Sequence, residues 1–200
     1  MIQPALVGHD FRRSLRHQQK ASRVAASTTN AGGGIGFLTV VFDEGQGWIG
    51  GYLVVNASAR PLEFHCTAPV KPNRAQEILY GPTLGCYLMG EQIAAALVNK
   101  SSSPPLAVIT DVEPVLAVRS QIDMPVVLLL NHASIETSAA SSLLQFDLAG
   151  RRVAVSDEYA ADRDRLLVGF PTLAQNFDLA EPLDRIREAI TETQLRGRAA

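Results

Sequence analysis

Three short apolar segments separated by turns open the hydrophobic pattern of the chain. Residues 37–42 are continuously apolar or β-branched, residues 48–55 form a second such run, and residues 62–67 alternate between apolar and polar side chains. Runs of this length and composition are typical of β-strands. Because the two connections are short, we expect the strands to pair antiparallel as a three-stranded meander.

Helices and buried strands alternate in the middle of the chain. Residues 83–99 are apolar nearly all round, which predicts a helix packed against a sheet or inside an interface. Residues 106–110 and 126–130 are short apolar runs, and the segment between them is long enough for a crossover. We therefore expect two parallel strands here, joined by a right-handed connection. Residues 143–155 predict a hairpin.

The last helix has the clearest apolar stripe, formed by Leu183, Ile186 and Ile190. Together the elements predict an α+β (mixed α/β) fold, in which a three-stranded antiparallel meander is extended by parallel strands and packed by helices. We expect one domain over residues 37–200.

Residues 1–36 carry little apolar periodicity and end in a glycine run, so we expect a flexible arm. Before Asp43 the only acidic residue is Asp10. Five residues of this stretch are basic, namely Arg12, Arg13, Arg16, Lys20 and Arg23. A basic arm is suited to contact the phosphates of a nucleic acid, and the alternative is a solvated tail.

Composition places the chain among soluble globular proteins. It is 46% hydrophobic and 19% charged, and the net charge of −2 argues against a globally basic nucleic-acid binder. The two cysteines form no CxxC pair, and no apolar run is long enough to span a bilayer. We therefore expect a cytoplasmic protein without membrane association. The low charge content leaves room for an apolar surface, and hence for a homo-oligomer or a protein partner.

Common catalytic and cofactor motifs are absent from the sequence. The glycine run precedes a strand, whereas a phosphate-binding loop follows a strand and opens a helix, so no nucleotide cofactor motif is present. There is no Gly-x-Ser-x-Gly elbow. His65 and Cys66 are neighbours in a predicted strand and face opposite sides, so His65 cannot activate the Cys66 thiol.

Four acidic residues are the candidates for chemistry. Asp43 ends the first predicted strand and Asp111 ends a parallel strand, where ligands bind in open α/β sheets. Glu77 and Glu91 lie on the helices between them, and Glu91 is isolated on an apolar helix. If these carboxylates converge, they form an oxygen site suited to Mg²⁺ or Mn²⁺. The alternative is that each acid serves a turn or a helix cap.

The order of the predicted elements resembles that of the ribonuclease H-like superfamily over residues 37–131. Segment 39–43, followed by segment 50–55, is similar to the opening hairpin of that superfamily. The resemblance implies two bound metal ions, held by an acid on the first strand, an acid on a helix and an acid that ends the fourth strand. The residues at those places are Asp43, Glu77 or Glu91, and Asp111.

Two functions follow as hypotheses. The first is a divalent-metal-dependent nuclease, or a related phosphoryl-transfer enzyme, with Asp43, Asp111 and Glu91 as catalytic acids and the basic arm on the nucleic acid. The second is a non-catalytic module that binds a protein partner or assembles with itself.

Overall fold

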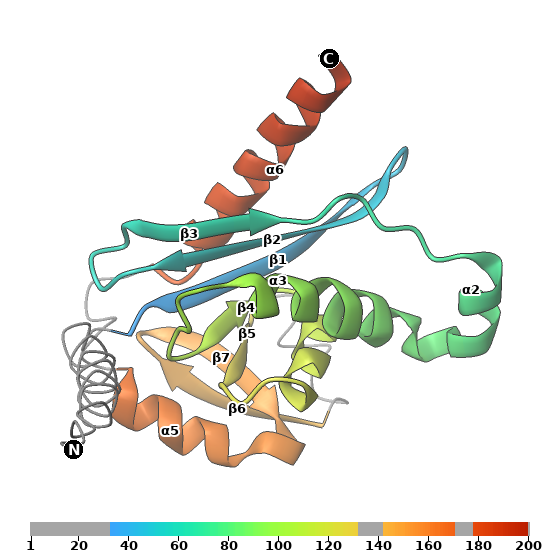
Figure 1. The fold of residues 1–200 in the computed structure, drawn as a ribbon. Coiled ribbons are helices and arrows are strands. Elements are labelled where there is room, and N and C mark those ends of the chain that lie inside the picture. Colours follow the sequence, from blue (N-terminus) through green and yellow to red (C-terminus); the bar gives the residue numbers. More distant parts are fainter. Residues whose placement is uncertain (1–32, 132–141, 171–177, 200) are drawn as a thin grey trace, which may run out of the picture. The chain divides into compact units, whose positions relative to one another are not determined.

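The strands form one mixed sheet of seven strands in the order β3-β2-β1-β4-β5-β7-β6 (Figure 1). Strands β1 (Ile35–Asp43), β2 (Gly47–Val55) and β3 (Pro61–Cys66) pair antiparallel, as the short turns predict. The first strand begins two residues before the predicted start. The computed structural model describes residues 33–131, 142–170 and 178–199, of which residues 196–199 are described in backbone only. The rest of the predicted basic arm, residues 1–32, lies outside them.

Parallel strands extend the meander on the other side of β1. Strand β4 (Val108–Thr110) runs parallel to β1, and β5 (Val126–Leu129) runs parallel to β4. The predicted hairpin is β6 (Leu143–Leu148) and β7 (Arg151–Ser156), with β7 antiparallel to β5. The predicted mixed α+β architecture is therefore confirmed.

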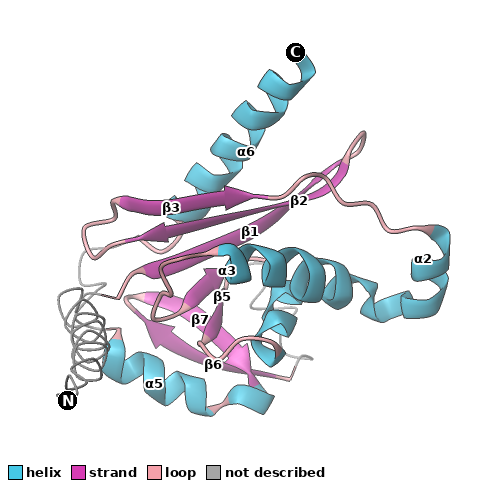
Figure 2. Ribbon diagram, viewed as in Figure 1, coloured by secondary structure: helices cyan, strands magenta, loops and turns pink. Residues whose placement is uncertain are grey.

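Helical segments cover both faces of the sheet (Figure 2). They are α2 (Arg74–Tyr80), η1 (Gly81–Thr83), η2 (Cys86–Ala94), α3 (Ala95–Lys100), η3 (Glu113–Ser120), η5 (Asp157–Tyr159), α5 (Ala161–Gly169) and α6 (Glu181–Ala199). The apolar helix predicted at 83–99 contains a π-helical stretch, η2. At Gly90 a Cβ atom would lie 2.7 Å from the Pro114 carbonyl oxygen, so the η2 backbone packs directly against η3.

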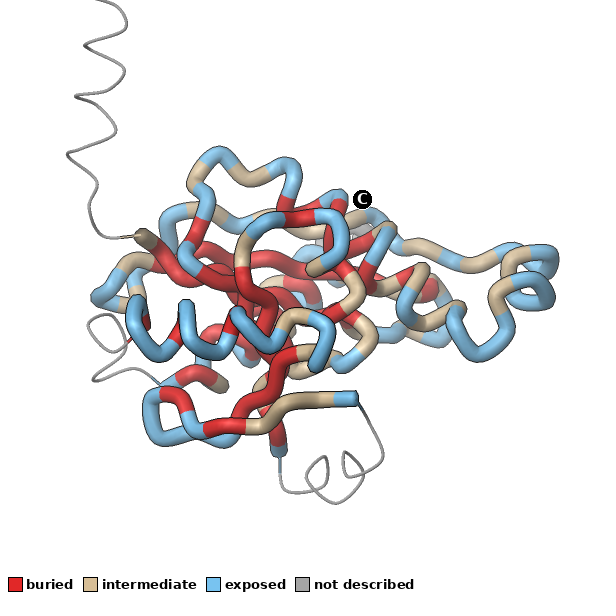
Figure 3. Tube along the Cα trace, turned by 90° about the horizontal axis from the view of Figure 1, so that it is seen from below, coloured by how far each residue is buried: buried red, intermediate tan, exposed pale blue. Residues whose placement is uncertain are grey.

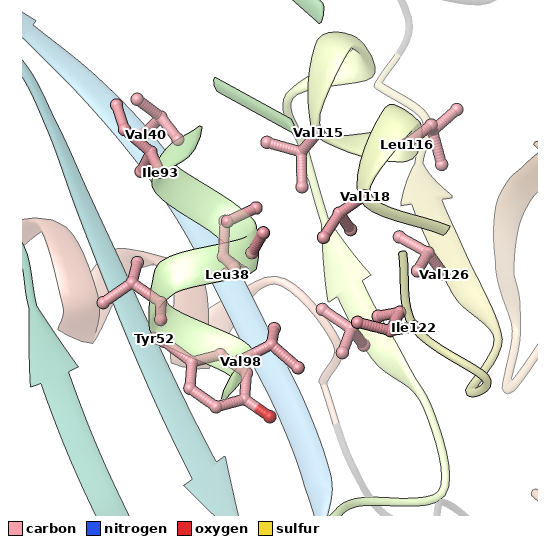
Figure 4. Packing of buried hydrophobic residues seen from close by; sticks show 14 of the residues in the cluster. Leu38, Val40, Tyr52, Ile93, Val98, Val115, Leu116, Val118, Ile122 and Val126 are labelled. Carbon is pink, nitrogen blue, oxygen red and sulfur yellow. The ribbon is translucent and has the colours of Figure 1, made fainter. Parts of the chain in front are cut away.

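Two hydrophobic cores lie on opposite faces of the sheet. One contains residues of α5 and α6, and the other contains residues of η2, α3 and η3 (Figure 4). Adjacent glycines on β2 bring helices close on both sides. A Cβ atom at Gly50 would lie 2.2 Å from Ile93, and one at Gly51 would lie 2.3 Å from Ile186. The sheet is thus held between α6 and the η2–α3 helix. Burial is greatest in the central strands, whereas the edge strand β3 has no buried residue (Figure 3).

Helix α2 differs from the α-helices α3, α5 and α6 because none of its residues is buried. Asn73 caps it and forms the predicted capping box with Gln76. In the described part of the chain, no helix has the length and apolarity needed to cross a membrane.

Candidate functional site

A pocket of about 560 Å³ lies at the carboxyl ends of the parallel strands β4 and β5. Asp111 follows β4, and Leu130 and Asn131 follow β5; all three line the pocket. The β6–β7 hairpin and the first turns of α6 contribute the remaining lining. We call this space the strand-end pocket. In sheets with parallel strands, this edge is the usual place for ligands.

Asp111 is held at the inner end of this pocket by two partners. The register pairs Leu38 with Thr110, so Thr39 on β1 and Asp111 lie at the same level. The buried Thr39 hydroxyl donates to Asp111 Oδ1 at 2.8 Å, and the Arg187 guanidinium donates to Asp111 Oδ2. Both carboxylate oxygens therefore have a hydrogen-bond donor.

Arg187 reaches Asp111 from α6 and also pairs with Asp184 on its own helix. Its second terminal nitrogen donates to Asp184 Oδ1 at 2.8 Å. One guanidinium thus bridges two carboxylates. Asp184 lies three residues before Arg187 on α6, and Asp111 lies at the end of β4. Partial burial lowers the pKa of Arg187 below its ordinary value, because desolvation disfavours the charged form.

Two further arginines line the outer part of the strand-end pocket. The turn of the β6–β7 hairpin, Ala149-Gly150, has positive φ at both residues (49° and 74°), which is typical of a type I′ turn. This turn places Arg151 and Arg152 at the start of β7. Arg151 pairs with Asp178 at 2.8 Å, and Arg152 pairs with Asp147 at 3.4 Å. Both arginine side chains are about half exposed, 50% and 46%.

The predicted acid Asp43 lies in the β1–β2 turn. Its Oδ1 accepts from the amides of Gly45 and Gln46, each at 2.8 Å, which is the turn geometry that the sequence offered as the alternative. It is four residues beyond Thr39 on an extended strand, a separation of roughly 13 Å.

The two predicted helix acids lie elsewhere. Glu77 pairs with Arg74 at 3.0 Å on the surface of α2. Glu91 lines a second pocket of about 540 Å³ together with Glu113 and Glu158, and the described lining of this pocket shares no residue with the strand-end pocket. Among the predicted acids, Asp111 is therefore the one that lies in the strand-end pocket.

A divalent cation would need several oxygen ligands close together. The described residues hold no group of three or more His, Cys, Asp or Glu side chains that could bind a metal ion. At Asp111 the oxygen donors are its own carboxylate and the Thr39 hydroxyl, and a guanidinium already occupies one carboxylate oxygen. Mg²⁺ prefers a nearly complete oxygen shell without a competing cation. This donor set does not fit the metal centre that the resemblance implies, and the ligand roles of Asp43, Glu77, Glu91 and Asp111 stay a prediction.

Sequence reasoning missed Thr39, Arg151, Arg152 and Arg187. Threonine in a buried strand and arginine on an amphipathic helix or hairpin have ordinary structural explanations, so no local pattern distinguishes them. Only the β1–β4 register, the docking of α6 and the pairing of the β6–β7 hairpin with β5 reveal that these side chains meet Asp111 or share its pocket.

No protein-family model matches this sequence, and no curated protein matches it. Among solved structures, the chain is similar to human endonuclease V, at 13% identity and a TM-score of 0.40, covering 86% of this chain and 87% of that chain. It is also similar to a variant of Ciona intestinalis endonuclease V in complex with inosine-containing DNA, at 9% identity and a TM-score of 0.39, covering 81% and 87%. The catalytic domain of human endonuclease V gives 12% identity and a TM-score of 0.35, covering 94% and 99%.

Proposed function

We propose that the strand-end pocket binds a phosphate group of a nucleic-acid strand, with Arg151 and Arg152 as the main contacts. The observation that carries this proposal is that three arginines line one pocket at the carboxyl ends of parallel strands. Arginine presents paired N–H donors that match the oxygens of a phosphate in bidentate geometry.

The lining also contains three aspartates, so a phosphate has to replace existing ion pairs. The pairs of Arg151 with Asp178 and of Arg152 with Asp147 are about half exposed or more, and pairs of this kind contribute at most about 1 kcal/mol. Replacing either aspartate by a phosphate as the partner of the arginine therefore costs little free energy. Asp111 is less exposed, and its pairing with Arg187 offsets the negative charge that would repel a phosphate there. The second partner of Arg187, Asp184, is 70% exposed, so water and salt screen its charge.

Fluorescence anisotropy with a labelled single-stranded oligonucleotide tests this proposal. The variant Arg151→Gln/Arg152→Gln should bind at least about tenfold more weakly at low salt, because each charge-assisted hydrogen bond contributes on the order of 1.5 kcal/mol. The wild type should also lose affinity as salt is raised. The control Lys100→Gln/Arg163→Gln removes the same charge from exposed positions outside the pocket and should retain most of the binding. Equal losses in both variants, or none in either, would contradict the proposal.

A second candidate function is the divalent-metal-dependent nuclease of ribonuclease H-like type. The position of Asp111 supports it, since this carboxylate ends β4 inside the strand-end pocket. The basic arm at residues 1–36 would contact the nucleic acid, and Asp43 with Glu77 or Glu91 would have to approach Asp111 to complete a Mg²⁺ or Mn²⁺ site. This candidate predicts Mn²⁺-dependent cleavage that Asp111→Asn abolishes while the folded state is retained, whereas a metal-free pocket predicts none. Binding without cleavage by the wild type favours the non-catalytic module instead.

A protein partner or a homo-oligomer stays a prediction as well. The exposed side chains of Ile78 and Leu79 on α2, 64% and 82% exposed, are the observation that favours it. Light scattering of the full chain, compared with an Ile78→Ser/Leu79→Ser variant, tests whether this helix supports self-association.

A further inference from the structure

We propose that Arg187 is a built-in cation that takes the place of a divalent metal at the strand ends, so that the strand-end pocket works without a metal ion. The inference goes beyond the proposed binding function and holds whether or not a phosphate binds there. It concerns which positive charge holds the carboxylates of this pocket together.

Arg187 joins two carboxylates through its two terminal nitrogens. One terminal nitrogen donates to Asp111 Oδ2 and the other donates to Asp184 Oδ1. Two carboxylates from distant parts of the chain therefore meet around a single positive charge. Carboxylates that meet around a positive charge in this way are also the ligand type that divalent ions take.

The neighbouring strand β1 supplies a neutral hydrogen-bond donor to Asp111. Thr39 stands level with Asp111, and its hydroxyl donates to Asp111 Oδ1 at 2.8 Å. The Thr39 hydroxyl and the Arg187 guanidinium thus give each carboxylate oxygen of Asp111 a hydrogen-bond donor. A second acid on β1 at this level would instead require an additional cation.

Arg187 is not part of the buried apolar face by which α6 packs on the sheet. The docking of α6 rests on Leu183, Ile186 and Ile190, which are all at most 3% exposed and belong to one hydrophobic core. The Arg187 side chain is 38% exposed and extends into the strand-end pocket. Its position is thus better explained by the charge of Asp111 and Asp184 than by packing of the helix.

Removal of the guanidinium should leave two carboxylates and one hydroxyl facing a vacated space. Methionine at position 187 retains an unbranched side chain without charge. We therefore expect Arg187→Met to gain a Mn²⁺ site formed by Asp111 and Asp184, with affinity at least about tenfold higher than any Mn²⁺ binding at this place in the wild type. Mn²⁺ should also raise the thermal midpoint of Arg187→Met and leave that of the wild type unchanged.

Electron paramagnetic resonance of free Mn²⁺, titrated into the full chain, measures this directly. The double variant Arg187→Met/Asp111→Asn should lose the gained site, and Arg187→Lys, which retains a positive charge, should not acquire it. A folded Arg187→Met that binds no more Mn²⁺ than the wild type would overturn the proposal.

A second test uses the wild type and Asp111→Asn, so its result does not depend on whether a variant at position 187 folds. If wild-type protein binds Mn²⁺ and Asp111→Asn removes that binding, Asp111 is a metal ligand and Arg187 does not replace a metal. Equal Mn²⁺ titrations of the wild type and Asp111→Asn support the proposal. Oligonucleotide binding is measured separately, so a failure of phosphate binding and a failure of this inference are distinguishable.

Discussion

Thr39 and Asp111 lie side by side on the parallel strands β1 and β4, and the Thr39 hydroxyl donates to Asp111 Oδ1 at 2.8 Å. Thr39 is 1% exposed, so its hydroxyl cannot bond to surface water in place of Asp111. Thr39→Val keeps the shape of the side chain and removes the hydroxyl. We expect a loss of about 1.5–3 kcal/mol of unfolding free energy, since the bond involves a charged acceptor.

Thr39→Ser is the matched control because it retains the hydroxyl. It should lose less than Thr39→Val in urea unfolding at neutral pH. If the valine variant is as stable as the wild type, the hydroxyl does not support Asp111.

The buried carboxylate of Asp162 anchors α5 to η3. Asp162 is 2% exposed and accepts from Arg119 Nε at 2.6 Å and from Arg119 Nη2 at 3.2 Å. This carboxylate also raises the pKa of Arg119. Asp162→Ala leaves the Arg119 charge without its partner and should cost about 3–5 kcal/mol.

Chemical denaturation measures that loss, with Asp147→Ala as the comparison. Asp147 pairs with Arg152 but is 75% exposed, so its removal should cost at most about 1 kcal/mol. Similar losses of unfolding free energy in the two variants would show that burial does not make the Asp162–Arg119 pair more important for stability than an exposed pair.

The close helix packing on β2 predicts that Gly50 tolerates no side chain. A Cβ atom there would lie 2.2 Å from the Ile93 side chain and 2.9 Å from Leu97. Gly50→Ala should therefore destabilise the protein by about 1–3 kcal/mol through overpacking. At Gly169, at the end of α5, nothing lies within 4 Å of an added Cβ atom, so Gly169→Ala should be neutral or slightly stabilising in the same thermal melts.

Glu63 on β3 gives the stability a specific dependence on acid. The Ser101 hydroxyl donates to its carboxylate at 2.7 Å, the Ser102 amide donates at 3.1 Å, and these bonds lower the pKa of Glu63 from 4.5 to about 2. A lowered pKa in the folded state means that the contribution is complete above pH 4.5 and is lost as the pH falls toward 2.

Glu63→Gln should accordingly lose less stability than the wild type as the pH falls from about 4.5 to about 2, the range between the ordinary pKa and the lowered pKa of Glu63. Urea unfolding at a series of pH values measures the slope. Glu44→Gln, in the exposed β1–β2 turn, should keep the wild-type slope. Parallel curves for Glu63→Gln and the wild type would contradict the role of Glu63.

Local patterns determined the elements of this protein and the class of its fold. Alternation and β-branching located β1, β2 and β3, short turns made them antiparallel, and the 3.6-residue stripe of Leu183, Ile186 and Ile190 located the buried face of α6. These features depend on neighbours within a few residues, so the chain order is enough to predict them. The same reasoning placed Asp111 at a strand end, where it lies.

Tertiary structure alone decided which side chains surround Asp111. The register that sets Thr39 beside it, the helix that brings Arg187, and the hairpin that adds Arg152 involve residues tens of positions apart. A shift of one residue in a strand reverses its faces, and the rotation of a docked helix selects which charge reaches a pocket. Contacts of this kind depend on the packing of the whole domain, which no segment of the chain specifies by itself.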